Sequence, residues 1–79
     1  MRKVQILGTG CAKCRKLYEH AEEARRESAL EFEVEKVEEI DRIIEFGVMM
    51  TPALVIDGVV KAVGKVPSKQ DIMKMLADG

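Results

Sequence analysis

The spacing of the apolar residues changes several times along this 79-residue chain, and the order of the changes restricts the possible folds. Residues 3–7 alternate with period two, which predicts a short strand. After a glycine-containing break at residues 8–10, a stripe with helical spacing begins near Cys11. Residues 31–37 alternate again with charged side chains on one face, which is typical of an edge strand, although Lys36 interrupts the pattern and predicts an end or a bulge there.

The second half of the chain predicts a short helix followed by a hairpin. Ile40, Ile43 and Ile44 have helical spacing and are expected to form a buried stripe, with Gly47 just beyond the helix end. Residues 53–56 are continuously apolar, which suits a strand buried on both faces. Asp57 and Gly58 follow directly after this apolar run. Asp57-Gly58 tolerates the positive φ angles of a two-residue turn, so residues 59–63 should return as the partner strand.

A last helix completes the predicted order of elements. Ser68 is a favourable N-cap, and Asp71 stands three residues later, as in a capping box. The order is therefore β-α-β-α-β-β-α, with the first two strands parallel and the last two antiparallel. We expect an α/β fold in which a four-stranded mixed sheet is flanked by three helices, and 79 residues leave room for one domain only.

Composition excludes several classes of function. Thirteen basic and fourteen acidic side chains give a formal net charge of −1, so no global attraction to nucleic acid or to an anionic membrane is expected. Only three aromatic residues are present, too few for a base-stacking platform. The apolar runs are too short to span a bilayer, and residues 1–7 lack the apolar core of an export signal. We therefore expect a cytoplasmic protein. We also expect it to be a monomer and to need no cofactor.

Both cysteines belong to one C-x-x-C unit between a predicted strand and a predicted helix. At the start of a helix, Cys11 faces unpaired backbone N–H groups and the positive end of the helix dipole, which favour a thiolate. Cys14 lies one turn further on, within the apolar stripe, and should be more shielded. This asymmetry predicts that Cys11 attacks an external disulfide and that Cys14 resolves the mixed disulfide. The first sixteen residues contain five basic side chains and no acidic one, which adds a local positive field.

A second motif, Thr51-Pro52, precedes the predicted buried strand. Proline cannot donate a hydrogen bond to a sheet, so it belongs at the first position of the strand. Most X–Pro bonds are trans, so these residues alone do not predict a cis bond.

Three motifs in this order resemble the thioredoxin superfamily over essentially the whole chain. They are the C-x-x-C after the first strand, Thr51-Pro52 before the third, and Val63-Gly64-x-x-x-Ser68-Lys69 before the last helix. The sequence is most similar to the very small archaeal and bacterial thioredoxins (redox-active disulfide protein 2), whose active site reads Gly-Thr-Gly-Cys-Ala-x-Cys. The resemblance implies a minimal thioredoxin/glutaredoxin-like fold and an enzyme that reduces protein disulfides.

The resemblance also implies roles for five residues. Cys11 matches the attacking cysteine and Cys14 the resolving one. Pro52 matches a cis-proline that lies against the disulfide, and Thr51 the residue whose backbone pairs with an extended substrate peptide. Gly64 matches a glycine that leaves room for the substrate. Disulfide-containing proteins and a thioredoxin-reductase-type electron donor are the implied partners.

This chain departs from larger thioredoxins at several of these positions. Their Trp-Cys-Gly-Pro-Cys is replaced by Gly10-Cys-Ala-Lys-Cys, so their redox potential cannot be transferred. Their buried aspartate, six residues before the first cysteine, corresponds to Gln5, so that water or another group must carry the proton. Glutaredoxins usually have Gly-Gly before the last helix, whereas this chain has Gly64-Lys65.

Two other functions remain open from the residues. A C-x-x-C before a first helix also occurs in Cu(I)-binding modules, and two thiolates suit Cu(I). Those modules follow the order β-α-β-β-α-β, however, whereas Ile40, Ile43 and Ile44 predict a helix where their second hairpin strand would lie. The third reading is an interaction domain with inert cysteines, in which the pKa of Cys11 would stay near the free value of about 8.5.

Overall fold

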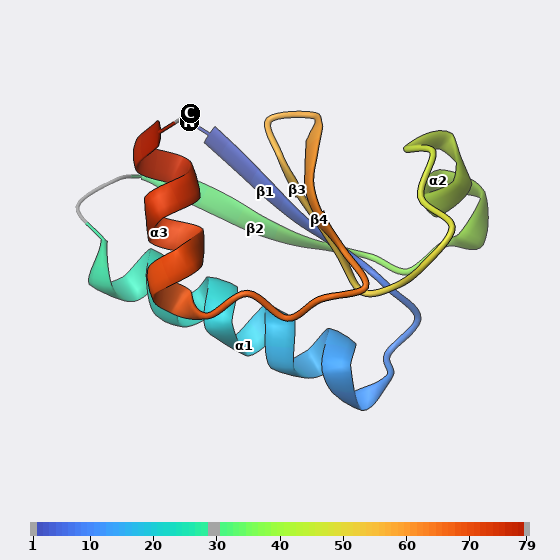
Figure 1. Cartoon of the computed structure of the whole chain (residues 1–79), viewed down its shortest axis with the longest axis horizontal. Helices are drawn as coiled ribbons and strands as arrows, with labels where there is room; N and C mark the ends of the chain where they lie inside the picture. Colours follow the sequence, from blue (N-terminus) through green and yellow to red (C-terminus); the bar gives the residue numbers. More distant parts are fainter. Residues whose placement is uncertain (1, 29–30, 79) are drawn as a thin grey trace.

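The computed structural model describes residues 2–28 and 31–78, in which the elements follow the predicted order β-α-β-α-β-β-α (Figure 1). The elements are β1 (Arg2–Leu7), α1 (Ala12–Glu27), β2 (Phe32–Val37), α2 (Ile40–Glu45), β3 (Ala53–Ile56), β4 (Val59–Val63) and α3 (Lys69–Asp78). The prediction of three helices and four strands is confirmed. In the described part of the chain, no helix combines the length and the apolar character needed to cross a bilayer.

The four strands form one mixed sheet in the order β2-β1-β3-β4. β1 pairs in parallel with β2 and antiparallel with β3, and β4 is antiparallel to β3. Asp57 and Gly58 connect the last two strands with φ angles of 50° and 83°, as predicted for a tight hairpin turn. In this strand order β2 lies at an edge of the sheet, where its alternating glutamates discourage pairing with another chain.

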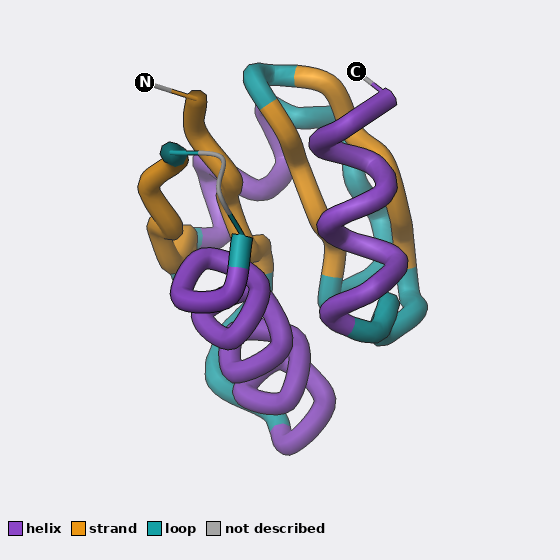
Figure 2. The backbone as a smooth tube through the Cα atoms, turned by 90° about the vertical axis from the view of Figure 1, so that its left-hand side faces the viewer, coloured by secondary structure: helices purple, strands orange, loops and turns teal. Residues whose placement is uncertain are grey.

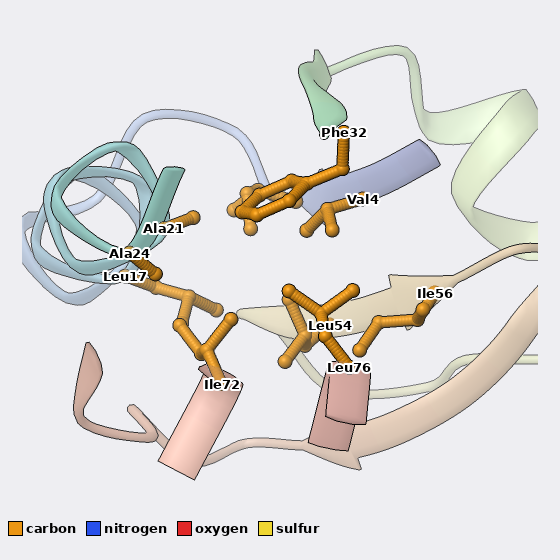
Figure 3. Close-up of a cluster of buried hydrophobic side chains, with 10 residues drawn as sticks. Val4, Leu17, Ala21, Ala24, Phe32, Leu54, Ile56, Ile72 and Leu76 are labelled. Carbon is orange, nitrogen blue, oxygen red and sulfur yellow. The ribbon is translucent and has the colours of Figure 1, made fainter. Parts of the chain in front are cut away.

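Helices cover both faces of the sheet. On one face, α1 and α3 (Figure 2) enclose the larger hydrophobic core, and Figure 3 shows side chains of both helices pointing into it. The buried residues of this core are Val4, Ile6, Leu17, Ala21, Ala24, Phe32, Leu54, Ile56, Ile72 and Leu76. On the other face, Ile43 of α2 and Val48 pack on Leu7, Val37, Ala53 and Val55. Alternate residues of β3 belong to different clusters, so the prediction that this strand is buried on both faces is confirmed.

The predicted buried stripe of α2 is wrong for two of its three residues. Ile43 is buried, whereas Ile40 and Ile44 are 63% and 62% exposed. A helix of six residues makes fewer than two turns, so only one of its side chains faces the sheet squarely. Gly47 follows the helix with φ 78°, as predicted, and its N–H donates to the carbonyl of Ile44.

Lys36 does not interrupt β2, contrary to the expectation of an end or a bulge. The strand continues to Val37 in regular parallel register, with Lys36 opposite Ile6. The ammonium group of Lys36 lies 4.4 Å from the centre of the Tyr18 ring on α1. Lys36 can therefore stand at a position of the strand where the alternation calls for an apolar residue. Its aliphatic stem covers the Tyr18 ring, and its ammonium group contacts the face of that ring.

The two helices on the larger core are held by polar contacts at the start of α3. Ser68 and Asp71 exchange reciprocal hydrogen bonds of 3.2 Å each, which confirms the predicted capping box. Lys69 lies 2.6 Å from the carboxylate of Glu27, and Nδ1 of His20 lies 2.8 Å from the carbonyl oxygen of Pro67. These contacts fix the end of α3 that lies nearer the loop after β4.

Candidate active site

One end of the sheet gathers the segments that the sequence singled out. Leu7 of β1 is opposite both Val37 and Ala53, and Ala53 is opposite Val63. These four residues form one row across the sheet, and the segments just beyond them carry the two cysteines, the Thr-Pro motif and the glycine after β4. Figure 1 shows the loops before α1 and before β3 together at this end.

Cys11 occupies the N-cap of α1, as predicted. Its backbone is extended (φ −69°, ψ 166°), and its sulfur accepts a hydrogen bond from the backbone N–H of Cys14 at 3.3 Å. An N-cap side chain normally uses oxygen for this contact, so the thiol of Cys11 takes the place of a serine or aspartate. Cys11 is exposed, whereas Cys14, one turn into the helix, is buried. The two sulfur atoms lie 2.6 Å apart, close to the bonding distance of about 2.05 Å.

The surroundings shift the acidities of the two thiols in opposite directions. Hydrogen bonds from the side chain and then the backbone of Cys14 hold the pKa of Cys11 below its ordinary value. Burial, followed by the hydrogen bond to Cys11, raises the pKa of Cys14. Cys11 is therefore the sulfur that ionises first and faces solvent, while Cys14 keeps its proton to higher pH.

Gly8 touches the sulfur of Cys14, a contact that the sequence analysis missed. A Cβ atom on Gly8 would lie 2.3 Å from Sγ of Cys14 and 3.1 Å from its Cβ. The same point lies 3.8 Å from Cβ of Thr51, so Gly8 lies close to both the buried cysteine and the Thr-Pro loop. The sequence suggested only that residues 8–10 break a strand. The signal that could have identified Gly8 is its place directly after a strand that leads into the C-x-x-C.

The Thr51–Pro52 peptide bond is cis, as the resemblance implied. Pro52 is buried immediately before β3, and Thr51 beside it is exposed. The carbonyl oxygen of Pro52 accepts a hydrogen bond of 2.7 Å from the backbone N–H of Gly64. The loop before β3 is therefore tied directly to the residue that ends β4.

Gly64 adopts a φ of 69°, in the region that favours glycine. A side chain there would also meet Met50, whose Cε lies 3.2 Å from the position of the missing Cβ. The side chain of Met50 thus occupies the space beside Gly64, and it is 61% exposed. Because methionine is flexible, this space can open toward the Thr-Pro loop when the side chain changes rotamer.

A metal ion finds few ligands at this end of the sheet. Across residues 2–28 and 31–78, no three His, Cys, Asp or Glu side chains are grouped so that they could hold one. The soft sulfur atoms at this end are the thiols of Cys11 and Cys14 and the thioether of Met50 beside Gly64. The observed order of elements also differs from the β-α-β-β-α-β order that the metal-binding alternative requires.

Cys11 is exposed at a helix start and has a lowered pKa, its partner is buried one turn later, and a cis-proline loop lies nearby. These features define a dithiol oxidoreductase with an α/β fold. Comparison with known proteins agrees with this class. A family model described as a thioredoxin domain matches residues 2–77. The chain belongs to the thioredoxin family, whose members are protein-disulfide oxidoreductases acting on disulfide-containing proteins.

Archaeal relatives are similar over nearly their whole length. A thioredoxin of Methanothermobacter thermautotrophicus is 46% identical over 77 residues, covering 98% of this chain and 100% of that protein. A thioredoxin of Methanocaldococcus jannaschii is 37% identical over 73 residues, covering 92% of this chain and 84% of that protein. A probable thioredoxin of Methanothermobacter thermautotrophicus is 34% identical over 71 residues, covering 86% and 82% respectively. The predicted similarity to small archaeal thioredoxins is confirmed.

Proposed function

We propose that residues 1–79 act as one monomeric domain that reduces protein disulfides, with Cys11 as the nucleophile and Cys14 as the resolving thiol. The observation that carries these roles is the difference between the two sulfurs, one exposed at a helix start and one buried 2.6 Å away. An exposed thiolate can reach a disulfide on another protein, whereas a buried thiol can reach only its neighbour.

The reaction proceeds in two exchanges. The Cys11 thiolate attacks one sulfur of the substrate disulfide, forming a mixed disulfide and releasing the other substrate sulfur as a thiolate. Cys14 then attacks Sγ of Cys11, which forms the Cys11–Cys14 disulfide and releases the second substrate sulfur. The substrate gains two electrons and two protons, and the protein loses them.

The substrate peptide binds, in this proposal, against Thr51, Pro52 and Gly64. The hydrogen bond between Pro52 and Gly64 supports a shared surface, since it joins the two loops into one rim beside Gly8 and Cys14. Thr51 is exposed on this rim, so its backbone can pair with an extended segment of the substrate. Met50 must swing aside for a substrate residue to lie next to Gly64.

Each turnover leaves the protein oxidised, so a second reaction must return two electrons to it. We assign this step to a thioredoxin-reductase-type donor. The cytoplasm is the compartment that suits the cycle, because thiols are kept reduced there.

Insulin reduction tests the assignment of the cysteines. Dithiothreitol drives turnover, and precipitation of the freed insulin B chain is followed as turbidity. We expect the wild-type protein to accelerate precipitation and Cys11→Ser to give only the dithiothreitol background. Cys14→Ser is the matched control, because it keeps the nucleophile and, incubated with insulin in the absence of dithiothreitol, should accumulate a mixed disulfide that is visible by mass spectrometry. Equal activity of Cys11→Ser and wild type would contradict the proposal.

A further inference from the structure

A small cavity lies beside the buried thiol. It is lined by Ile6, Gly8, Gly10, Cys14, Arg15, Lys36 and Glu38, and its volume is about 20 Å³. A cavity needs at least about 10–15 Å³ by this measure to hold one water molecule. The cavity therefore has room for one water next to Cys14, with polar groups on its wall.

Strand pairing brings Glu38 to this cavity. Leu7 and Val37 are opposite each other at the ends of β1 and β2, and the N–H of Gly8 donates to the carbonyl of Val37 at 3.0 Å. Glu38 is the next residue after this row. Its Oε2 lies 3.8 Å from the point where a Cβ on Gly10 would be, so the carboxylate rests against the loop that leads to the cysteines.

The resolving step needs a proton acceptor. Cys14 must become a thiolate to attack Cys11, and burial favours its neutral form. The residue six positions before Cys11 cannot accept this proton, because the Gln5 side chain is an amide. Gln5 is also engaged elsewhere, as its Nε2 donates to Glu35 at 2.8 Å.

Three charged side chains line the cavity, and only one of them has a free lone pair at neutral pH. Arg15 carries a guanidinium, which stays protonated and has no acceptor. Lys36 is an ammonium, and it lies over the Tyr18 ring. Glu38 carries a carboxylate, which can accept a proton, and it lines the same cavity as Cys14.

We propose that Glu38 is the proton acceptor for Cys14 in the resolving step, acting through one water in this cavity. The inference rests on the resolving role proposed for Cys14 above. The proton leaves Sγ of Cys14 for the water, and the water passes a proton to the Glu38 carboxylate. The new bond joins the two cysteine sulfurs, and the bond between Cys11 and the substrate sulfur breaks. Glu38 then returns the proton to the departing substrate thiolate or to solvent.

The test uses an aromatic disulfide, 5,5′-dithiobis(2-nitrobenzoate), with stopped-flow absorbance. Attack by Cys11 releases a first coloured thiolate, and resolution by Cys14 releases a second, so the two steps are timed separately. In Glu38→Gln we expect an unchanged or faster first step and a second step slowed about a hundredfold at neutral pH. General-base catalysis usually contributes about 10²–10⁴-fold, and transfer through a water to an exposed carboxylate belongs at the lower end.

The pH profile separates proton transfer from simple electrostatics. Removal of a negative charge alone would favour the thiolate of Cys14 and accelerate the second step, which is opposite to the expected change. The deficit of Glu38→Gln should shrink as rising pH ionises Cys14 without help, and Glu38→Asp should recover part of the rate. Glu33→Gln, an equal charge change on the exposed side of β2, is the control and should leave both steps unchanged.

The outcomes keep the two proposals apart. If the second step in Glu38→Gln is as fast as in wild type, or faster, the role of Glu38 is overturned while the resolving role of Cys14 stands. A second step equally slowed by Glu33→Gln would also overturn the role of Glu38, since the effect would then follow charge and not position. A wild-type protein that releases no second thiolate would instead contradict the resolving role of Cys14.

Discussion

Cys11 and Cys14 differ in the access of water to their sulfur atoms, and the residues around them maintain that difference. The helix start leaves Cys11 in solvent, where hydrogen bonds from Cys14 favour its thiolate. The sulfur of Cys14 is buried partly because Gly8 has no side chain to displace it. Gly8, directly after the strand that leads into the C-x-x-C, therefore meets a packing requirement as well as ending the strand.

Replacement of Gly8 should disturb the buried thiol. The new methyl group of Gly8→Ala would overlap Sγ of Cys14, and overpacking of this kind typically costs about 1–3 kcal/mol of unfolding free energy. We expect a slower resolving step as well, because Cys14 must move. Urea denaturation and the two-step thiolate release measure these effects. In a Cys14→Ala background the cost should fall, since the 2.3 Å contact is gone, and an undiminished cost would show that the clash lies elsewhere.

The hairpin of β3 and β4 is anchored to β1 through its turn. Asp57 accepts hydrogen bonds from the backbone N–H of Lys3 at 2.9 Å and from the Arg2 side chain at 2.8 Å. These contacts, the backbone bond first, hold the pKa of Asp57 below its ordinary value. Since Ala53 of the same hairpin follows the cis-proline, this anchor at the far end of β3 supports the strand that follows the Thr-Pro loop.

The charge of Asp57 should make stability depend on acid pH. Its folded-state pKa is depressed, so its contribution is complete above the unfolded-state value of about 3.9 and is lost as pH falls through the folded-state value. Asp57→Asn keeps a residue that tolerates the positive φ of the turn and removes only the charge. The variant should be less stable than wild type at neutral pH, and the difference should shrink below about pH 4. Urea denaturation across pH checks this, and a difference independent of pH would contradict it.

Across the whole molecule, the features that the sequence predicted correctly are those that depend on residues close to one another along the chain. The alternation of residues 3–7, the helical stripe after Cys11 and the Asp57-Gly58 turn depend on local spacing, and the order of elements followed from them. The roles expected of the two cysteines needed only the helix start. Local patterns were less reliable for α2, where Ile40 and Ile44 have helical spacing but too short a helix to bury them.

Contacts between distant segments could not be predicted in this way. The approach of Gly8 to Cys14 depends on how α1 leaves the sheet, and the place of Glu38 depends on the register that sets Val37 opposite Leu7. A shift of two residues in that register would keep every apolar side chain on its face and still carry Glu38 away from the site. The expectation of a strand end or bulge at Lys36 was wrong for a related reason, since its partner Tyr18 lies on another element.

The pH dependence of alkylation at each cysteine of the reduced protein tests the central assignment most directly. Iodoacetamide reacts with thiolates, and mass spectrometry of the digested protein follows Cys11 and Cys14 separately. We predict that Cys11 reacts with a midpoint below the free-thiol value of about 8.5, and that Cys14 reacts only at higher pH. Coincident profiles, or a Cys14 that reacts first, would contradict the account.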